Sequence, residues 1–242
     1  KALLVIDYTN DFIAPNGALT CGDPGRKIDD RIKELADLFK EGDYVIFPTD
    51  THQKNDPYHP ETKLFPPHNI KGTSGHDLYG KTAEWFNAHK DSDFVYQFDK
   101  NRYSSFQNTN LDNYLRSRGI TELWLSGVCT DICVLHTAIA AYNLNYSLTI
   151  PEDAVASFDQ TGHEWAMNHF KNCLGATIAD LPNTVLSPLS THIEKIMQNK
   201  QAGKKSAQIE KPDDLQLIAN LIRFFGSLSN GVDDLENFTS EM

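Results

Sequence analysis

Six short segments dominated by apolar residues recur along the chain and alternate with segments of helical periodicity. The first segment, residues 2–6, is apolar at every position, which is typical of a strand buried on both faces of a parallel sheet. The other five segments are residues 44–48, 94–98, 122–126, 146–150 and 176–179. This alternation predicts an α/β fold: a three-layer α/β/α sandwich around a mostly parallel six-stranded sheet.

The segments between the predicted strands carry apolar residues at steps of three and four, as the buried faces of helices do. They predict helices over residues 28–39, 111–115, 131–144 and 161–174. One long interruption, from Thr49 to Gly75, holds three histidines and has little periodicity. A loop of this length inside a compact domain is usually functional or disordered, and its His and Asp content favours function.

The composition of the chain excludes several classes of protein. The chain has 242 residues and a net charge of −11, from 22 Lys plus Arg against 33 Asp plus Glu. The acidic balance argues against a nucleic-acid-binding surface, and the apolar runs are too short to cross a bilayer. Four scattered cysteines do not suit a disulfide scaffold, and no signal-peptide pattern opens the chain, so we expect a cytoplasmic protein.

The character of the sequence changes near residue 187. We expect the α/β domain to occupy residues 1–186, and residues 187–242 to form a helical C-terminal extension with an acidic, frayed end. The extension contains a strongly apolar helical pattern over residues 215–225, which would cap the domain or build a subunit interface. A homo-oligomer is therefore expected, and the extension is interpreted as structural, without a catalytic role.

Three reactive side chains follow three of the predicted strands. Asp7 ends the first strand, Lys100 follows the third, and Cys133 lies at the start of the helix after the fourth. Each alone has an ordinary structural interpretation, but an open α/β sheet builds its active site beyond the carboxyl ends of its strands. Together they indicate nucleophilic catalysis by Cys133.

The chemistry of such a set can be worked out from the residue types. An ammonium about 4 Å from a thiol, at an effective dielectric near 20, favours the thiolate by roughly 4 kcal/mol, or about three pKa units. Lys100 and the helix N-terminus are therefore expected to lower the pKa of Cys133. Asp7 is interpreted as the base that takes the thiol proton, and the backbone N–H groups of Cys129 and Cys133 would hold the developing oxyanion.

A second group of side chains lies in and before the long loop. Asp50 and His52 are two residues apart, so in extended chain they face the same side, and His68 can return from the loop with Glu61 between them. Two imidazoles and a carboxylate suit Zn²⁺, Fe²⁺ or Mn²⁺ with positions left open for substrate. The alternative is that Asp50 and His52 only hydrogen-bond within a turn, and that His68 is a surface residue.

These motifs, in this order, resemble the isochorismatase-like cysteine hydrolases, and among them the nicotinamidase (pyrazinamidase) family. The resemblance covers roughly residues 1–186 and is carried by five stretches: VIDYTNDF at residues 5–12, DTH at 50–52, FPPH at 65–68, FDK at 98–100 and GVCTDICV at 127–134.

The resemblance implies roles for particular residues. Asp7, Lys100 and Cys133 match the catalytic triad of the family, and the Val128–Cys129 bond matches a non-proline cis peptide that aims amides at the substrate oxygen. Asp50, His52 and His68 match the metal ligands, and Glu61 matches an additional ligand of some members. Phe12, Phe65 and Tyr103 match the walls of an aromatic-amide pocket.

The implied reaction is hydrolysis of nicotinamide to nicotinate and ammonia through a cysteine thioester, in NAD salvage, with pyrazinamide as a further substrate. One divalent metal ion is implied, with zinc favoured over iron or manganese. Two alternatives remain: an amidohydrolase of the same fold acting on a carbamoyl or ureido compound, and a non-catalytic pyridine-binding protein. The remaining histidines, His59 among them, are interpreted as solvated or core residues.

Overall fold

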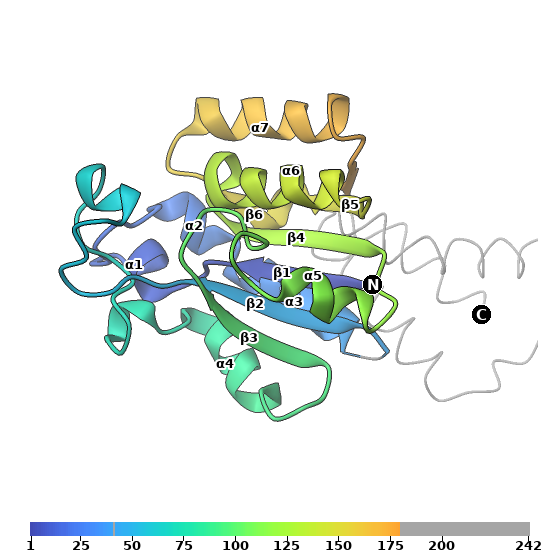
Figure 1. The fold of residues 1–242 in the computed structure, drawn as a ribbon, viewed down its shortest axis with the longest axis horizontal. Helices are drawn as coiled ribbons and strands as arrows, with labels where there is room; N and C mark the ends of the chain where they lie inside the picture. The colour runs from blue at the N-terminus through green and yellow to red at the C-terminus, as the bar shows by residue number, and fades with distance from the viewer. Residues whose placement is uncertain (41, 180–242) are drawn as a thin grey trace, which may run out of the picture. The chain divides into compact units, whose positions relative to one another are not determined.

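The computed structural model describes residues 1–40 and 42–179, and the expected extension over residues 187–242 lies outside them. A parallel sheet forms the centre of this part of the chain (Figure 1). Its strands are β1 (Ala2–Ile6), β2 (Tyr44–Asp50), β3 (Val95–Lys100), β4 (Glu122–Val128), β5 (Ser147–Pro151), β6 (Val155–Ala156) and β7 (Thr177–Ala179). The order is β3-β2-β1-β4-β5-β7, with β6 paired to the end of β4.

In residues 1–40 and 42–179 the sheet has seven strands, where the sequence predicted six. The additional strand, β6, is two residues long and follows a short 3₁₀ turn, η4 (Glu152–Ala154). Two residues carry no periodicity that a sequence pattern could reveal. The other six strands lie where the apolar segments predicted them, within one or two residues at each end.

Seven α-helices surround the sheet in the described residues: α1 (Asn10–Ile13), α2 (Asp23–Lys27), α3 (Asp29–Phe39), α4 (Gly80–His89), α5 (Leu111–Arg116), α6 (Leu135–Asn143) and α7 (Gln160–Asn172). A π-helical turn, η3 (Thr130–Val134), precedes α6, and the long loop contains two 3₁₀ turns, η1 (Pro60–Lys63) and η2 (Ser74–His76). None of these helices has the length and apolar character that crossing a bilayer requires. In Figure 1, α6 and α7 lie together above the sheet and α4 lies below it.

Alternate residues of each strand point to opposite faces of the sheet, and both faces are covered. Leu4 and Ile6 of β1 belong to a core cluster that includes residues of α5, α6 and α7. On the other face, the ring of Phe39 in α3 packs against Trp124, with ring centroids 5.4 Å apart. Two covered faces explain why the strands are almost continuously apolar.

The carboxyl ends of β1 and β4 approach each other closely. Gly127 has a φ of +104°, and a Cβ added there would lie 2.0 Å from the carbonyl oxygen of Ile6. Only glycine fits both the backbone conformation and the space. This close approach brings the residues after β1 and β4 together at one edge of the sheet, where the predicted triad residues lie.

Candidate active site

Asp7, Lys100 and Cys133 meet in the protein interior at this edge of the sheet. Asp7 directly follows β1, and its Oδ2 lies 2.7 Å from the Nζ of Lys100 at the end of β3. Both side chains are fully buried. The thiol of Cys133, in η3, is buried beside them, close enough to the Asp7 carboxyl group for the two groups to shift each other's pKa. The structure therefore brings all three sequence-predicted residues into one cluster around Asp7.

Asp7 is held from two sides. Its backbone has a φ of +55°, the left-handed conformation that Asp tolerates better than most residues. Its N–H donates to the carbonyl oxygen of Pro48 at 3.1 Å, and its Oδ1 accepts from the N–H of Asp50 at 2.7 Å. These contacts to β2 leave Oδ2 facing Lys100, so the carboxyl group has one orientation.

The charge state of Asp7 suits proton transfer. Burial disfavours the carboxylate and raises the pKa of Asp7 to about 6, although the Lys100 ammonium lowers it. The same burial lowers the pKa of Lys100, but the negative groups around it, Asp7 first, outweigh burial and keep the ammonium protonated. At neutral pH most of Asp7 is therefore ionised, yet it can hold a proton at little cost.

The pKa of Cys133 corrects one sequence-based expectation. The sequence predicts that Lys100 gives Cys133 a lowered pKa, but the net pKa of this thiol is raised well above the ordinary value. Burial away from water is the largest cause, and the Lys100 ammonium offsets only part of it because Asp7 and Asp50 act in the opposite direction. The resting side chain is a thiol, so a neighbouring base must take its proton before the sulfur can react.

The turn that carries Cys133 has an unusual backbone. The peptide bond between Val128 and Cys129 is cis, and a π-helical turn follows it. The carbonyl oxygen of Cys129 accepts hydrogen bonds from the N–H groups of Ile132 and Val134, at 3.0 and 3.2 Å. The sequence predicted a plain helix over residues 131–144, whereas the α-helix begins only at Leu135.

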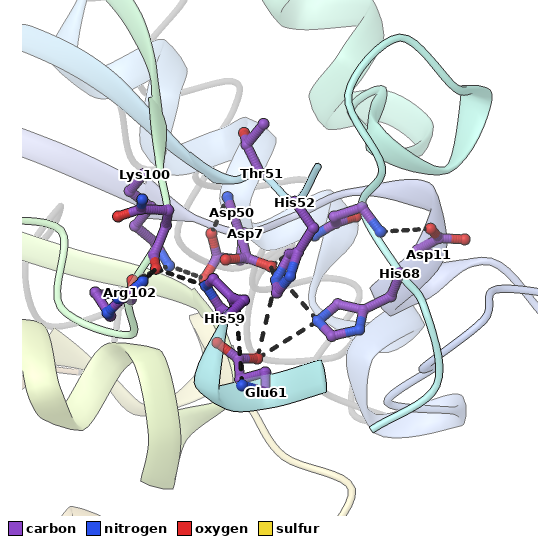
Figure 2. Close-up of polar contacts among 12 residues, drawn as sticks. Asp7, Asp11, Asp50, Thr51, His52, His59, Glu61, His68, Lys100 and Arg102 are labelled. Atoms are coloured by element: carbon purple, nitrogen blue, oxygen red, sulfur yellow. Dashed lines mark hydrogen bonds and ion pairs between the residues drawn. The ribbon is translucent and has the colours of Figure 1, made fainter. Parts of the chain in front are cut away.

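Four potential metal ligands form a second buried group, which lies beside Asp7 and Lys100 (Figure 2). Asp50, His52, Glu61 and His68 each offer one atom, and these atoms all lie within 4.8 Å of one another. The Oδ2 of Asp50 is 2.9 Å from the Nε2 of His52 and 3.6 Å from the Nε2 of His68. Asp50 and His52 come from the end of β2, and the other two come from the long loop.

His68 is prepared to act as a ligand. Its Nδ1 lies 2.7 Å from the carbonyl oxygen of Pro66, which can only accept, so in the neutral ring Nδ1 carries the hydrogen and Nε2 carries the lone pair. That Nε2 is buried and has no hydrogen-bond partner among residues 1–40 and 42–179, and the Oε2 of Glu61 is 3.5 Å away. A divalent cation among these four side chains would satisfy the buried nitrogen, so the donor set fits such an ion.

His59 holds one of the loop residues in place, a role that the sequence did not reveal. Its Nε2 donates to the carbonyl oxygen of Asn101 at 2.8 Å, and its Nδ1 accepts from the N–H of Glu61 at 3.3 Å. Its ring also packs on His52, with centroids 4.3 Å apart. His59 is therefore a buried support of the ligand group. Its partner Asn101 is 42 residues away in sequence, so no local pattern could predict the role of His59.

The three predicted pocket aromatics lie around these groups. The rings of Phe12 and Phe65 are 5.4 and 6.2 Å from that of His68, measured between centroids. Tyr103 packs on His136 at 5.1 Å. Burial raises the pKa of Tyr103 to about 12, helped by the negative charge of Glu61, so its hydroxyl stays protonated.

Asp50 joins the two groups into one site. Its backbone N–H holds the Asp7 carboxylate, and its side chain lies among the potential metal ligands. The site combines a nucleophile, a base and a ligand set within one buried region. This arrangement can bind a small polar molecule at a cation and present it to a thiol.

Comparison with known proteins places this arrangement in a family. A model of the isochorismatase domain matches residues 1–181. The chain belongs to the isochorismatase family. A protein of Bacillus subtilis strain 168, described as the uncharacterized isochorismatase family protein PncA, is 55% identical over 181 residues, which are 74% of this chain and 99% of that protein.

Solved structures of the family share the fold. The crystal structure of nicotinamidase PncA from Bacillus subtilis matches with a TM-score of 0.72 and 55% identity, over 74% of this chain and 98% of that chain. A pyrazinamidase of Pyrococcus horikoshii, solved in complex with zinc, matches with a TM-score of 0.65 and 28% identity, over 74% and 98% of the two chains. The predicted isochorismatase-like hydrolase fold is confirmed.

Proposed function

We propose that this protein is a nicotinamidase, which hydrolyses nicotinamide to nicotinate and ammonia in NAD salvage and also accepts pyrazinamide. The observation that carries the proposal is the position of Asp50, which hydrogen-bonds the base of the triad and belongs to the ligand group. A substrate that needs both a cation and a nucleophile fits this site. The solved relatives named as nicotinamidase and pyrazinamidase support the same substrate class.

The reaction begins with proton transfer between two buried side chains. The Asp7 carboxylate takes the proton of the Cys133 thiol, which lies beside it. The thiolate attacks the amide carbon, and the N–H groups of Cys129 and Cys133 stabilise the negative oxygen. Lys100 compensates the negative charge of the cluster throughout, because its ammonium stays 2.7 Å from Asp7.

Asp7 then acts in the reverse direction. The proton it holds passes to the leaving nitrogen, so ammonia departs and a thioester remains on Cys133. The ionised Asp7 next removes a proton from water, which attacks the thioester. The C–S bond breaks, Asp7 returns the proton to the Cys133 sulfur, and nicotinate is released. A pKa of about 6 suits both steps, since Asp7 must both accept and donate near neutral pH.

Asp50, His52, Glu61 and His68 would hold one divalent cation, with zinc first and iron or manganese as alternatives. The bound ion would supply a Lewis-acid coordination site for the pyridine nitrogen. Phe12 and Phe65, which flank His68, would enclose the ring of the substrate. The Pyrococcus horikoshii relative, a pyrazinamidase solved in complex with zinc, supports a divalent metal as cofactor.

The ligand group separates this proposal from its alternatives. A carbamoyl or ureido hydrolase needs the triad but no cation, so a buried set of four potential ligands favours a pyridine amide. A non-catalytic pyridine-binding protein would need the ligands but not the triad. Location in the cytoplasm, assembly into a homo-oligomer and the absence of a nucleic-acid partner remain predictions from the sequence.

The direct test is ammonia release from nicotinamide by the protein and by its Cys133→Ala variant. The protein should release ammonia, and the variant should lose at least about 10³-fold in kcat, because it lacks the sulfur that forms the thioester. Cys173→Ala, which changes an exposed free cysteine, is the matched control and should keep full activity. Normal turnover by Cys133→Ala would refute the proposal.

A further inference from the structure

Asn69 follows the potential ligand His68 in the chain, and its backbone is bonded on both sides. It is fully buried and has a φ of +44°, a left-handed conformation that Asn adopts more readily than most residues. Its N–H donates to the Oδ2 of Asp11 at 2.7 Å. Its carbonyl oxygen accepts from the N–H of His52 at 3.0 Å, so Asn69 links the segments that carry His68 and His52.

The side chain of Asn69 reaches a third potential ligand. Its Nδ2 donates a long hydrogen bond, 3.5 Å, to the Oδ2 of Asp50, and its Oδ1 accepts from the hydroxyl of Thr9 at 2.9 Å. The orientation of the amide follows from chemistry, since a carboxylate oxygen can only accept and must face the NH₂ group. Thr9 then has to donate to the remaining oxygen, which fixes the side chain in one direction.

The bonded oxygen of Asp50 is the one that faces the ligand group. Oδ2 is the atom near the Nε2 atoms of His52 and His68. A carboxylate oxygen has capacity for more than one partner, so the Asn69 contact leaves room for a cation on the same atom. Asn69 therefore contacts Asp50 and His52 through hydrogen bonds and His68 through the chain itself.

We propose that Asn69 is a positioning residue that sets the affinity of this site for its divalent cation. It does so by fixing the relative positions of Asp50, His52 and His68, with Thr9 holding its amide in the required orientation. The inference rests on the metal site of the proposed function. Supporting contacts of this kind typically contribute 10–100-fold to metal affinity, because they orient ligands before the ion binds.

The test is zinc binding to the full chain, freed of metal with a chelator and titrated with Zn²⁺ in a calorimeter. Asn69→Gly removes the side chain but tolerates the left-handed backbone and keeps both backbone hydrogen bonds. We expect it to bind zinc about 10–100-fold more weakly. Thr9→Val removes only the hydroxyl that orients the amide, and should weaken zinc binding about fivefold, as loss of one hydrogen bond would.

Asn145→Gly is the matched control, because Asn145 is exposed and has a similar φ of +64°. It should bind zinc as the parent does. If Asn69→Gly folds and binds zinc as tightly as the parent, the inference is wrong. If Asn69→Gly does not fold, Thr9→Val decides: unchanged affinity in that variant overturns the inference. If the parent protein binds no zinc, the metal site does not exist and the inference is wrong. If the parent binds zinc, the variants test this inference whether or not the protein hydrolyses nicotinamide.

Discussion

The triad and the ligand group are both buried at the same edge of the sheet, but the chain builds them differently. Asp7, Lys100 and Cys133 follow three different strands, and the sheet fixes their spacing. Of the four potential ligands, only Asp50 and His52 lie at a strand end, and Glu61 and His68 come from the long loop. The triad is positioned by the sheet, whereas the ligand group depends on side-chain hydrogen bonds within and around a loop.

The difference has a consequence for substitution. A change in the triad should remove chemistry and leave the framework intact. A change around the ligand group should alter binding of the cation by degrees, according to how directly the residue contacts a ligand. Zinc affinity and turnover, measured on the same variants, therefore separate the two groups.

The largest effect is expected from Asp7→Asn. The amide has the same shape and its oxygen can still accept from the N–H of Asp50, but it cannot take the proton of Cys133. We expect kcat for ammonia release to fall about 10³–10⁴-fold, with zinc affinity changed by no more than a few-fold. Asp91→Asn, at an exposed position, is the matched control. A similar loss in zinc affinity and in turnover would show that the two groups are not separable.

His68→Ala is expected to have a large effect on zinc affinity instead of on the triad. It removes a ligand whose Nε2 has no hydrogen-bond partner in the described part of the chain, so zinc affinity should fall by more than about 100-fold. The reaction of Cys133 with a small thiol reagent should keep its rate, because the triad is untouched. His169→Ala, in α7, serves as the control. Zinc affinity equal to that of the parent would remove His68 from the ligand set.

A smaller effect is expected from His59→Ala. The change removes the hydrogen bonds to Asn101 and to the N–H of Glu61 but leaves every ligand in place. Zinc affinity should fall about tenfold, and added zinc should restore turnover by mass action. Turnover that stays low at saturating zinc would place His59 among the groups that act on the substrate.

The sequence predicted the residues of the triad, but not His59 and Asn69, which hold the ligand group in place. Asp7, Lys100 and Cys133 stand in recognisable motifs at the ends of apolar runs, so their proximity follows from the parallel topology. The raised pKa of Cys133 did not follow, because burial depends on everything packed around the sulfur. His59 and Asn69 were missed since their partners lie 42 and 60 residues away in the chain.

The fold shows the same limit. The strands and four helices carry periodicity that the sequence displays, but α4 was missed. Its first turn is capped by Asp29, whose carboxylate accepts from the N–H groups of Lys81 and Thr82 at 2.8 and 3.0 Å. A cap supplied from more than 50 residues away leaves no local signal. Local patterns thus predicted the longer periodic elements. They missed β6, which is only two residues long, and α4, whose cap comes from a distant part of the chain.

The central claim is that the triad and the ligand group form one site. Ammonia release from nicotinamide, measured before chelation, after chelation and after zinc is restored, tests it most directly. We predict that turnover is lost with the chelator and returns with zinc, while Cys133 stays reactive toward a thiol reagent throughout. Turnover at the same rate after complete removal of metal would contradict the claim and leave the triad as a site that works alone.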